Sequence, residues 1–387
     1  MPAARTSEPA PTSTPPRPLS VVVLADDLTS AADGAAPFRR TGHRALVRFA
    51  APTGPVTLDA GVTAVDLGTR ITDETTAAAR MREAAQAYAR AGAGLLLKTV
   101  DSTLRGHVAA ELRAALAGSG RRTAILAPAF PAEGRTTVDG VQYVRGVRVD
   151  ESAFARDPAH PVRTADLTRL LPEATLLTLA PDDLSPDALT QLDKGGVFVC
   201  SAATDADLDA LVAAVPRPED VLWVGSPGLA DALARRHPRT PAAAPRPGLP
   251  PVHRPLAVVG SAHPASRRQL AALRPLDAAA VHTPEERAGD PAPLLRRLVA
   301  ESRAAVHEGR ADGLVLTGGE TAAAVLVALG GTGIELYDEP EPGIARGTLH
   351  GEHARVPRIP VLVKAGGFGD DGTLVRLTRL LAAGGPR

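Results

Sequence analysis

The chain has 387 residues, of which 43 are basic and 43 acidic, so its formal net charge is zero. This balance argues against nucleic acid or another polyanion as the main partner, and an aromatic content of 3% argues against a base-stacking surface. The length exceeds the size at which a single hydrophobic core stops growing, so we expect two domains.

Residues 1–18 are rich in Pro, Ser, Thr and Ala and lack the apolar stretch of a secretory signal, which predicts a disordered tail. No apolar run approaches the length of a membrane span. The single cysteine, Cys200, lies in an apolar run and cannot form an internal disulfide, which fits a reducing compartment. We therefore expect a cytoplasmic protein without membrane or nucleic-acid contacts, and a homo-oligomer is compatible with this sequence.

From residue 19 to 236, short β-rich apolar runs alternate with Ala- and Leu-rich helical stretches. This alternation predicts an α/β domain with a mainly parallel sheet. The expected strands are 19–24, 45–49, 62–67, 95–98, 123–127, 176–179, 197–200 and 221–224. The expected helices include 31–38, 74–91, 105–116, 205–215 and 227–235.

Residues 237–255 are so dense in proline that they predict a linker rather than a helix or a central strand. A second, smaller α/β unit then occupies residues 256–387. Its expected strands are 256–259, 314–317 and 361–364, and its expected helices are 266–273, 294–307, 321–329 and 373–383. The predicted fold class is thus two α/β domains with mainly parallel sheets and an active site in the cleft between them.

Polar side chains follow three expected strands of the first domain, at the sheet edge where open α/β folds bind ligands. Asp26 and Asp27 follow the first strand, where one carboxylate would cap the next helix and the other would face the cleft, or both would only cap. Arg70 ends a second such loop, as an anion contact or as part of an ordinary surface loop. The third stretch contributes Lys98, Asp101, Ser102 and Arg105.

A further loop, residues 128–143, has a path fixed by two prolines and carries Arg135 with two threonines. Its Asp139-Gly140 pair suits a tight hairpin turn. Arg135 is a candidate for substrate binding if this small hairpin covers the site, and a plain hairpin is the alternative.

Three glycine-containing loops follow the three expected strands of the second domain. Glycine lets a backbone approach a phosphate, and helix N-termini supply N–H donors, so together the loops predict a nucleotide cradle. No P-loop pattern is present. The candidate nucleotide-binding residues are Ser261, His263, Gly318, Gly319, Glu320, Thr321, Gly366 and Gly367. A pair with metal-ligand spacing, His350 and His353, lacks a third ligand nearby, so no protein metal site is predicted.

Five motifs in this order resemble the four-carbon acid sugar kinase family, which includes kinases of D-threonate, D-erythronate and 3-oxo-tetronate. The resemblance covers nearly all of residues 19–381, and the chain departs from the family's common pattern at Leu67 and His263. The motifs are Ala25-Asp-Asp-Leu-Thr, Lys98-Thr-Val-Asp-Ser-Thr-Leu-Arg-Gly106, Pro128-Ala-Phe-Pro with Gly134-Arg-Thr-Thr, Gly318-Gly-Glu-Thr321 and Lys364-Ala-Gly-Gly-Phe-Gly369.

The resemblance implies a sugar-acid-binding domain, a nucleotide-binding domain and transfer of the ATP γ-phosphoryl group to the terminal hydroxyl of a four-carbon acid. It would place Asp26, Asp27, Lys98, Asp101, Ser102 and Arg105 on the sugar-acid side. The nucleotide candidates above, apart from His263, would lie on the ATP side.

Phosphoryl transfer depends mainly on positioning and charge stabilisation. We expect Arg105 or Lys98 to hold the substrate carboxylate. Asp27, or Asp101 as the second choice, would orient or deprotonate the attacking hydroxyl. Mg²⁺ would bridge the ATP phosphates and be held partly by water.

Two other functions use similar features: an NAD-dependent sugar-acid dehydrogenase and a sugar-acid sensor without turnover. Residues 367–372 match the Gly-x-Gly-x-x-Gly pattern of dinucleotide-binding loops. Asp370 and Asp371 inside this match would place negative charge beside a pyrophosphate, which disfavours the dehydrogenase.

Overall fold

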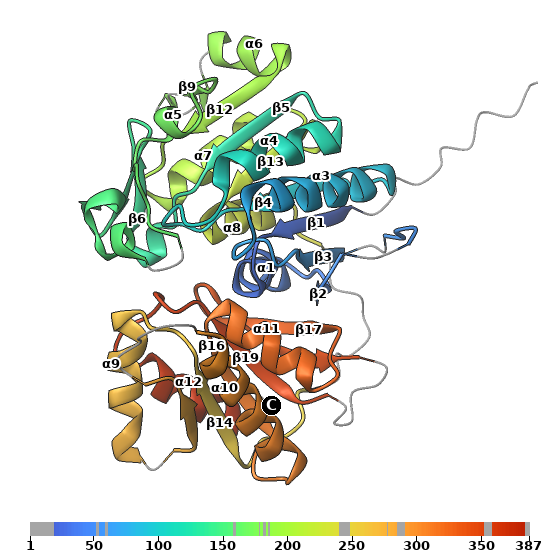
Figure 1. Ribbon diagram of the computed structural model, residues 1–387. Coiled ribbons are helices and arrows are strands. Elements are labelled where there is room, and N and C mark those ends of the chain that lie inside the picture. Colours follow the sequence, from blue (N-terminus) through green and yellow to red (C-terminus); the bar gives the residue numbers. More distant parts are fainter. Residues whose placement is uncertain are drawn as a thin grey trace, which may run out of the picture.

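The computed structural model describes residues 19–51, 54–58, 61–157, 160–177, 179–180, 183–184, 186–239, 248–276, 278–284, 291–351 and 358–383. The expected N-terminal tail, the middle of the expected linker and His353 lie outside these residues. Figure 1 shows the two α/β domains one above the other, with the chain's first half in the upper one.

The first domain is built on eight mutually parallel strands. Apolar runs that are buried on both faces are typical of such sheets, and every residue of the β4, β5 and β13 strands is buried. In spatial order the strands are β2 (Ala45–Arg48), β3 (Gly61–Asp66), β1 (Ser20–Ala25), β4 (Leu95–Thr99), β13 (Val221–Gly225), β5 (Thr123–Ala127), β12 (Gly196–Cys200) and β9 (Thr175–Leu177).

Helices cover both faces of this sheet, as the strand–helix alternation predicts. They are α1 (Leu28–Ala35), α2 (Pro37–Arg40), α3 (Glu74–Arg90), α4 (Val108–Ser119), α5 (Leu167–Leu170), α6 (Pro186–Lys194), α7 (Asp205–Ala214) and α8 (Pro227–Arg236). The helix expected at 31–38 starts earlier because Asp27 caps α1, and Pro37 opens the separate short helix α2. The helix expected at 105–116 starts later because Leu104 and Gly106 adopt left-handed conformations.

The small hairpin expected around Gly140 is present. Asp139 and Gly140 both have positive φ, as a two-residue turn of this kind requires. The added strands are β6 (Arg135–Val138), β7 (Val141–Val144) and β8 (Val147–Arg148), with a separate pair, β10 (Leu179–Ala180) and β11 (Asp183–Leu184). Single 3-10 turns span Pro131–Glu133, Val149–Glu151, Ala153–Arg156, Pro218–Asp220 and Arg274–Leu276.

The second domain has four parallel strands followed by an antiparallel pair. In spatial order they are β15 (Ala280–His282), β14 (Pro255–Val259), β16 (Gly313–Thr317), β19 (Pro360–Lys364), β18 (Ile344–His350) and β17 (Gly333–Glu341). The helices are α9 (Pro264–Leu273), α10 (Ala292–His307), α11 (Gly319–Ala328) and α12 (Thr373–Ala382). The mixed α/β class with a mainly parallel sheet is confirmed.

The β17–β18 hairpin is the main element that the sequence did not predict. The β17 strand carries four acidic residues and Pro340 among its nine residues, a composition with low strand propensity. Pairing on both sides overrides this propensity, since β17 lies between β18 and β2.

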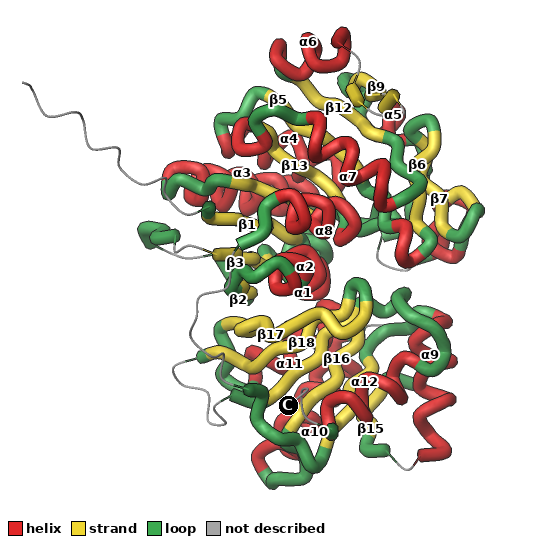
Figure 2. The backbone as a smooth tube through the Cα atoms, turned by 180° about the vertical axis from the view of Figure 1, so that it is seen from behind, coloured by secondary structure: helices red, strands yellow, loops and turns green. Residues whose placement is uncertain are grey.

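The β2–β17 pairing joins the sheets of the two domains edge to edge (Figures 1 and 2). It is antiparallel, with Ile334 opposite Val47 and Gly333 opposite Arg48. Among the described residues a single hydrogen-bonded sheet of 14 strands therefore runs through both domains. This junction covers two sheet edges that would otherwise be exposed and fixes where the domains meet.

The α1 helix lies at this junction, and all eight of its residues are buried. Its alanines, together with strand residues such as Val21 and Val363, belong to one hydrophobic core that continues from the first domain into the second. Small side chains allow this close packing; a Cβ on Gly34 would stand 2.6 Å from Cγ2 of Thr99. The position of the polar side chains on α1 is therefore set by both domains.

The α3 and α4 helices pack together on the opposite face of the first sheet, and Gly118 of α4 lies tightly against the backbone of Arg82 on α3. We expect Gly118→Ala to destabilise the fold by about 1–3 kcal/mol, because the added methyl would overlap the carbonyl oxygen of Arg82. Helix propensity alone predicts the opposite sign, a gain of about 0.5–1 kcal/mol. The measurement is the thermal unfolding midpoint. Gly248→Ala, where a Cβ meets nothing within 4 Å, is the matched control, and an unchanged or raised midpoint for Gly118→Ala would contradict this packing.

Candidate active site

The strand-end loops of both domains meet at a small enclosed cavity between the domains. Its volume is about 20 Å³, roughly the space of one water molecule. A substrate of several carbon atoms can therefore enter only if the domains separate or side chains move. The lining residues are Thr29, Ser30, Asp33, Arg70, Val100, Asp101, Ser102, Thr103, Arg105, Arg135, Phe154 and Pro227 from the first domain, and Ala365, Gly367 and Phe368 from the second.

Asp26 and Arg70 form a buried two-point ion pair beside this cavity. Nε of Arg70 donates to Oδ2 of Asp26 and Nη2 donates to Oδ1, both at 2.8 Å. Burial opposes ionisation of Asp26, but the charge and hydrogen bonds of Arg70, together with the charge of Lys98, outweigh it and lower the pKa of the carboxyl. Gly106 permits this arrangement, because a Cβ there would lie 2.8 Å from Oδ2 of Asp26 and its φ is +87°.

Asp27 caps α1 with one oxygen and faces the second domain with the other. Oδ1 accepts from the backbone N–H of Ser30 at 2.8 Å and from the hydroxyl of Thr29 at 3.0 Å. Oδ2 lies 2.8 Å from Nη1 of Arg70. It also lies against Gly319, where an added Cβ would stand only 2.5 Å away. The same carboxylate thus serves both functions that the sequence analysis divided between the pair.

Asp101 and Arg105, from the loop after β4, form a second ion pair of the first domain that lines the cavity. Oδ1 of Asp101 accepts from the backbone and the hydroxyl of Thr103, and Oδ2 pairs with Arg105 and, at 3.4 Å, with Arg70. Although burial opposes ionisation, Arg105 and Arg70 hold the pKa of Asp101 well below its usual range. The guanidinium of Arg105 lies 5.4 Å from the ring centre of Phe154, a cation–π geometry.

Lys98 is placed differently from the other candidates of its loop. It is 1% exposed, and its Nζ lies 2.7 Å from Oε2 of Glu111 on α4. The other oxygen of Glu111 accepts from the hydroxyl of Thr69. Lys98 does not belong to the residues that line the cavity, and its charge is compensated inside the first domain.

Ser102 and Arg135 both reach the cavity. The hydroxyl of Ser102 is buried and has no hydrogen-bond partner within the described residues. Arg135 donates to the carbonyl oxygen of Gly367 at 3.3 Å and lies 5.3 Å from the ring centre of Phe368, so it links the small hairpin to the second domain. Glu133 completes this link by accepting from the N–H of Gly369.

Asp33 is a cavity residue that the sequence analysis missed. It is 5% exposed on α1, and its Oδ1 has no partner among the described residues. Burial, followed by the charge of Asp27, raises the pKa of Asp33 well above its usual value. The available signal was a single charged residue in the stretch Leu28–Ala35, whose other residues are uncharged and mostly small.

The three glycine loops of the second domain lie at one edge, after the parallel strands β14, β16 and β19. Gly318 has a φ of +99° and precedes α11, and Thr321 of that helix packs against Gly260. Gly366 packs against Ser261, since a Cβ there would overlap the serine hydroxyl. Two of these loops lead into the starts of α9 and α11, and helix N-termini of this kind can bind a phosphate.

Two further candidates of the second domain differ in their surroundings. Nδ1 of His263 accepts from the N–H of Ala265 and caps α9, and its ring stacks on Phe154 of the first domain with centres 5.3 Å apart. Burial and nearby cations lower the pKa of His263 to about 4. Glu320, in contrast, is exposed in the first turn of α11.

Lys364, at the end of β19, was not among the sequence candidates. Its Nζ donates to the carbonyl oxygens of Ala365 at 2.8 Å and Phe368 at 3.0 Å. Burial lowers the pKa of Lys364 to about 7. Both hydrogen bonds hold the backbone of the glycine loop that follows β19, so Lys364 stabilises that loop.

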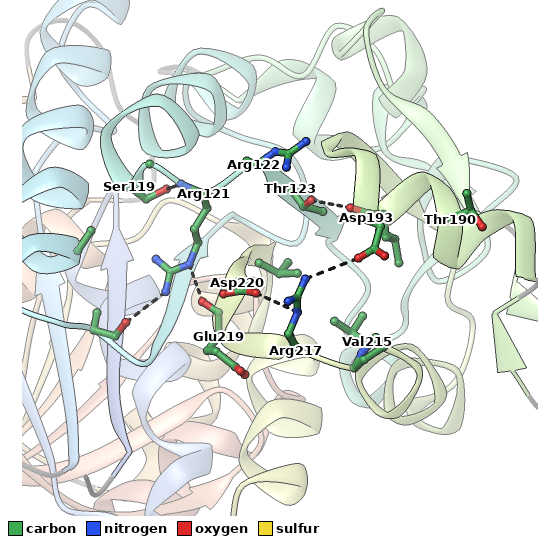
Figure 3. A pocket seen from close by; sticks show the side chains of 16 residues that line it. Ser119, Arg121, Arg122, Thr123, Thr190, Asp193, Val215, Arg217, Glu219 and Asp220 are labelled. Atoms are coloured by element: carbon green, nitrogen blue, oxygen red, sulfur yellow. Dashed lines mark hydrogen bonds and ion pairs between the residues drawn. The ribbon is translucent and has the colours of Figure 1, made fainter. Parts of the chain in front are cut away.

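A different hollow, of about 660 Å³, lies at the opposite edge of the first sheet (Figure 3). Its charged groups bind one another: Arg217 pairs with Asp193 and Asp220, and Arg121 donates to the carbonyl oxygen of Glu219. The C-terminal ends of helices point toward this edge, and their dipoles disfavour anions. These features favour the cavity between the domains as the site of chemistry.

The described part of the chain contains no group of three or more His, Cys, Asp or Glu side chains arranged to hold a metal ion. No helix in that part is long and apolar enough to cross a membrane.

Known proteins resemble the chain over nearly its whole length. A family described as "Sugar-binding N-terminal domain" matches residues 21–233, and one described as "Nucleotide-binding C-terminal domain" matches residues 284–374. The D-threonate kinase of Bordetella bronchiseptica is 35% identical, over 93% of this chain and 96% of its own. The D-threonate kinase of Salmonella typhimurium is 30% identical, over 92% and 97%.

A solved structure of a Bordetella bronchiseptica protein, a domain-swapped dimer with bound citrate, also matches. It is 33% identical, with 94% of this chain and 98% of that chain covered and a TM-score of 0.51. The identity and coverage of the two kinases confirm the resemblance on which the sequence analysis relied, and the matched families agree with a sugar-binding first domain and a nucleotide-binding second domain. The exact domain boundaries stay a prediction. The chain is a kinase that belongs to the four-carbon acid sugar kinase family.

Proposed function

We propose that this kinase transfers the γ-phosphoryl group of ATP to the terminal hydroxyl of a four-carbon sugar acid, with D-threonate as its first substrate. The observation that carries the proposal is the convergence of the charged strand-end loops of the first domain and the glycine loop after β19 on one cavity. D-threonate is favoured because relatives with this activity match both domains at 30% identity or more. D-erythronate and 3-oxo-tetronate are the alternatives from the sequence.

In this proposal Arg105 holds the substrate carboxylate. Its guanidinium reaches the cavity and is the most exposed of the first domain's ion-paired cavity cations, with 24% of its side chain accessible against 13% for Arg70. A guanidinium binds a carboxylate through two parallel hydrogen bonds, so an incoming carboxylate would replace Asp101 as its partner. Arg70 and Arg135 would add positive charge, and Ser102 would offer its free hydroxyl.

Asp27 is proposed to orient the attacking hydroxyl toward the nucleotide, because Oδ2 lies against Gly319 at the start of α11. The glycine loops with Ser261, Thr321 and Gly366 would hold the ATP phosphates through backbone N–H groups and helix N-termini. Mg²⁺ would arrive with ATP and neutralise phosphate charge with few protein ligands. Closure of the domains would exclude water and limit ATP hydrolysis.

We also propose a cytoplasmic location and a homo-oligomer. The homo-oligomer is supported by the domain-swapped dimer seen for the matching Bordetella bronchiseptica protein.

The direct test is an ADP-release assay with D-threonate, D-erythronate, their 3-oxo forms and related aldonates. We expect D-threonate to give the highest kcat/KM, and a chelator of divalent cations to abolish turnover until Mg²⁺ is restored. Thermal shift measured in parallel distinguishes the kinase from a sugar-acid sensor that binds the acid without turnover. If an acid raises the melting temperature of the protein but no combination of ATP and an acid releases ADP, the proposal is contradicted.

The carboxylate assignment predicts that Arg105→Lys raises the KM for the acid about 10-fold or more, because lysine lacks the planar fork. The KM for ATP should change little, since Arg105 belongs to the first domain. Initial rates at varied acid and at varied ATP separate the two constants. An acid KM equal to that of the unaltered protein would assign the carboxylate to another group.

Lys98 was the other candidate for the carboxylate, and its pairing with Glu111 gives a separate prediction. Lys98→Met should destabilise the fold by about 3–5 kcal/mol, because it leaves Glu111 charged and buried without its partner. The double variant Lys98→Met, Glu111→Gln should recover part of this loss and keep the acid KM. A rise in acid KM in the stable double variant would show that Lys98 binds substrate.

A further inference from the structure

The α1 helix places three polar side chains on the face that lines the cavity. Asp33 follows Ser30 by three residues and Thr29 by four, so it lies next to both of them on the helix surface. Ser30 accepts from Nη2 of Arg70 at 2.9 Å, and the hydroxyl of Thr29 donates to Asp27. Oδ1 of Asp33 is buried and has no partner within the described residues.

The other carboxylates near the cavity are engaged in hydrogen bonds and ion pairs. Asp26 gives both oxygens to Arg70. Asp27 gives one oxygen to the α1 cap and the other to Arg70. Asp101 gives one to Thr103 and the other to Arg105 and Arg70. Both oxygens of each of these three carboxylates are already bound, which suits them to positioning other groups.

The surroundings of Asp33 have the opposite effect. The charged groups facing it are Asp27 at the start of its own helix, Arg70 and Asp101 from the loops after β3 and β4, and Glu339 from β17. Burial is the largest influence and three of these four groups are acidic, so the pKa of Asp33 is raised well above its usual value. General bases work best when their proton affinity is close to the working pH.

The place of Asp33 in the cavity also fits proton transfer. The cavity that it lines is bounded on one side by Arg70, Asp101 and Ser102 and on the other by the loop that follows β19, with Gly367 and Phe368. A substrate hydroxyl in this space would lie between the sugar-acid side chains and a nucleotide loop. Asp33 is thus a carboxyl group with a free buried oxygen at the boundary between the two domains.

We propose that Asp33 is the general base of this kinase and accepts the proton of the attacking hydroxyl. This inference rests on the proposed function. The hydroxyl oxygen forms a bond to the γ-phosphorus as the bond from that phosphorus to the bridging β–γ oxygen breaks. The electron pair of the broken bond leaves with ADP, and the hydroxyl proton moves to a carboxylate oxygen of Asp33. Asp33 returns this proton to solvent when the domains open.

The test compares Asp33→Asn with the unaltered protein in the ADP-release assay. Asparagine keeps the shape of a protonated carboxyl group but cannot accept the proton, so we expect kcat to fall by about 10²–10⁴-fold while both KM values change little. The matched control is Asp205→Asn, which removes another carboxyl of raised pKa, on α7, that is not among the residues lining the cavity, and it should leave kcat unchanged. A kcat for Asp33→Asn above one-tenth of the unaltered value would overturn the assignment.

The pH dependence gives a second readout. Asp33 must be ionised to accept a proton, so kcat of the unaltered protein should rise with pH through the raised pKa of Asp33. In Asp33→Asn the residual rate should lose this dependence. If kcat of the variant shows the same fall at low pH, this fall, and with it the role of base, belongs to a different group.

Stability separates loss of chemistry from loss of fold. The pKa of Asp33 is higher in the folded than in the unfolded chain, so the folded state binds more protons and its stability falls as pH rises between the two values. Asparagine has no such dependence, and the variant should melt at the same temperature or higher at pH above that window. If it melts lower, Asp33→Ala with added formate replaces it: recovery of kcat supports the base, and no recovery overturns it.

Failure of the inference and failure of the proposed function give different results. If the unaltered protein releases no ADP with any acid of the panel, the proposed function is wrong, whatever the variants show. If it turns over D-threonate and Asp33→Asn does so at a similar rate, the function stands and Asp33 is not the base.

Discussion

Three carboxylates converge on the single guanidinium of Arg70, and the first domain's half of the cavity depends on this ion-pair group. Asp26, Asp27 and Asp101 follow two different strands, β1 and β4, and all lie within 3.4 Å of Arg70, which itself follows β3. Without this cation their mutual repulsion and desolvation would be uncompensated, since breaking a buried ion pair typically costs about 3–5 kcal/mol. Burial opposes ionisation of Arg70, but the three carboxylates raise its pKa well above the usual value. The cluster therefore stays charged and fixes the loops of three neighbouring strands to one another.

The junction of the two sheets determines what this cluster faces. Antiparallel pairing of β2 with β17 and burial of α1 on all sides bring the start of α11 against Asp27. The same contact gives Gly319 a purpose beyond its suitability for phosphate binding, because any side chain there would displace the Asp27 carboxylate. Arg135 and Glu133 fasten the small hairpin to the loop after β19. The charged loops of the first domain and the glycine loop after β19 are thus held together by contacts that must loosen before a molecule of several carbon atoms can enter the cavity.

Local patterns explain why so much could be predicted. The β5 strand has the predicted bounds, and β4 and β14 differ from them by one residue, because their apolar runs are short, continuous and followed by turn residues. The β17–β18 hairpin escaped prediction because its acidic residues and proline disfavour a strand unless two neighbours supply the pairing. Lys98 shows that the role of a candidate site residue can likewise depend on a partner that is distant in the sequence. Its loop is full of candidate ligands, yet its side chain turns to Glu111 on α4, a partner that no spacing rule connects with it.

The sequence by itself determined the α/β class, the order of strands and helices, the family and the loops in which the site lies. These follow from periodicity, from turn residues and from motifs that are contiguous in the chain. Only the tertiary structure decided how the charges of those loops are shared. Asp27 is both helix cap and interdomain contact, Asp101 is held by two arginines, and one oxygen of Asp33 has no partner among the described residues. Each outcome depends on which side chains from distant segments lie within reach. Proton affinity is a property of that three-dimensional surrounding, so a sequence can name the carboxyl groups but cannot rank them as bases.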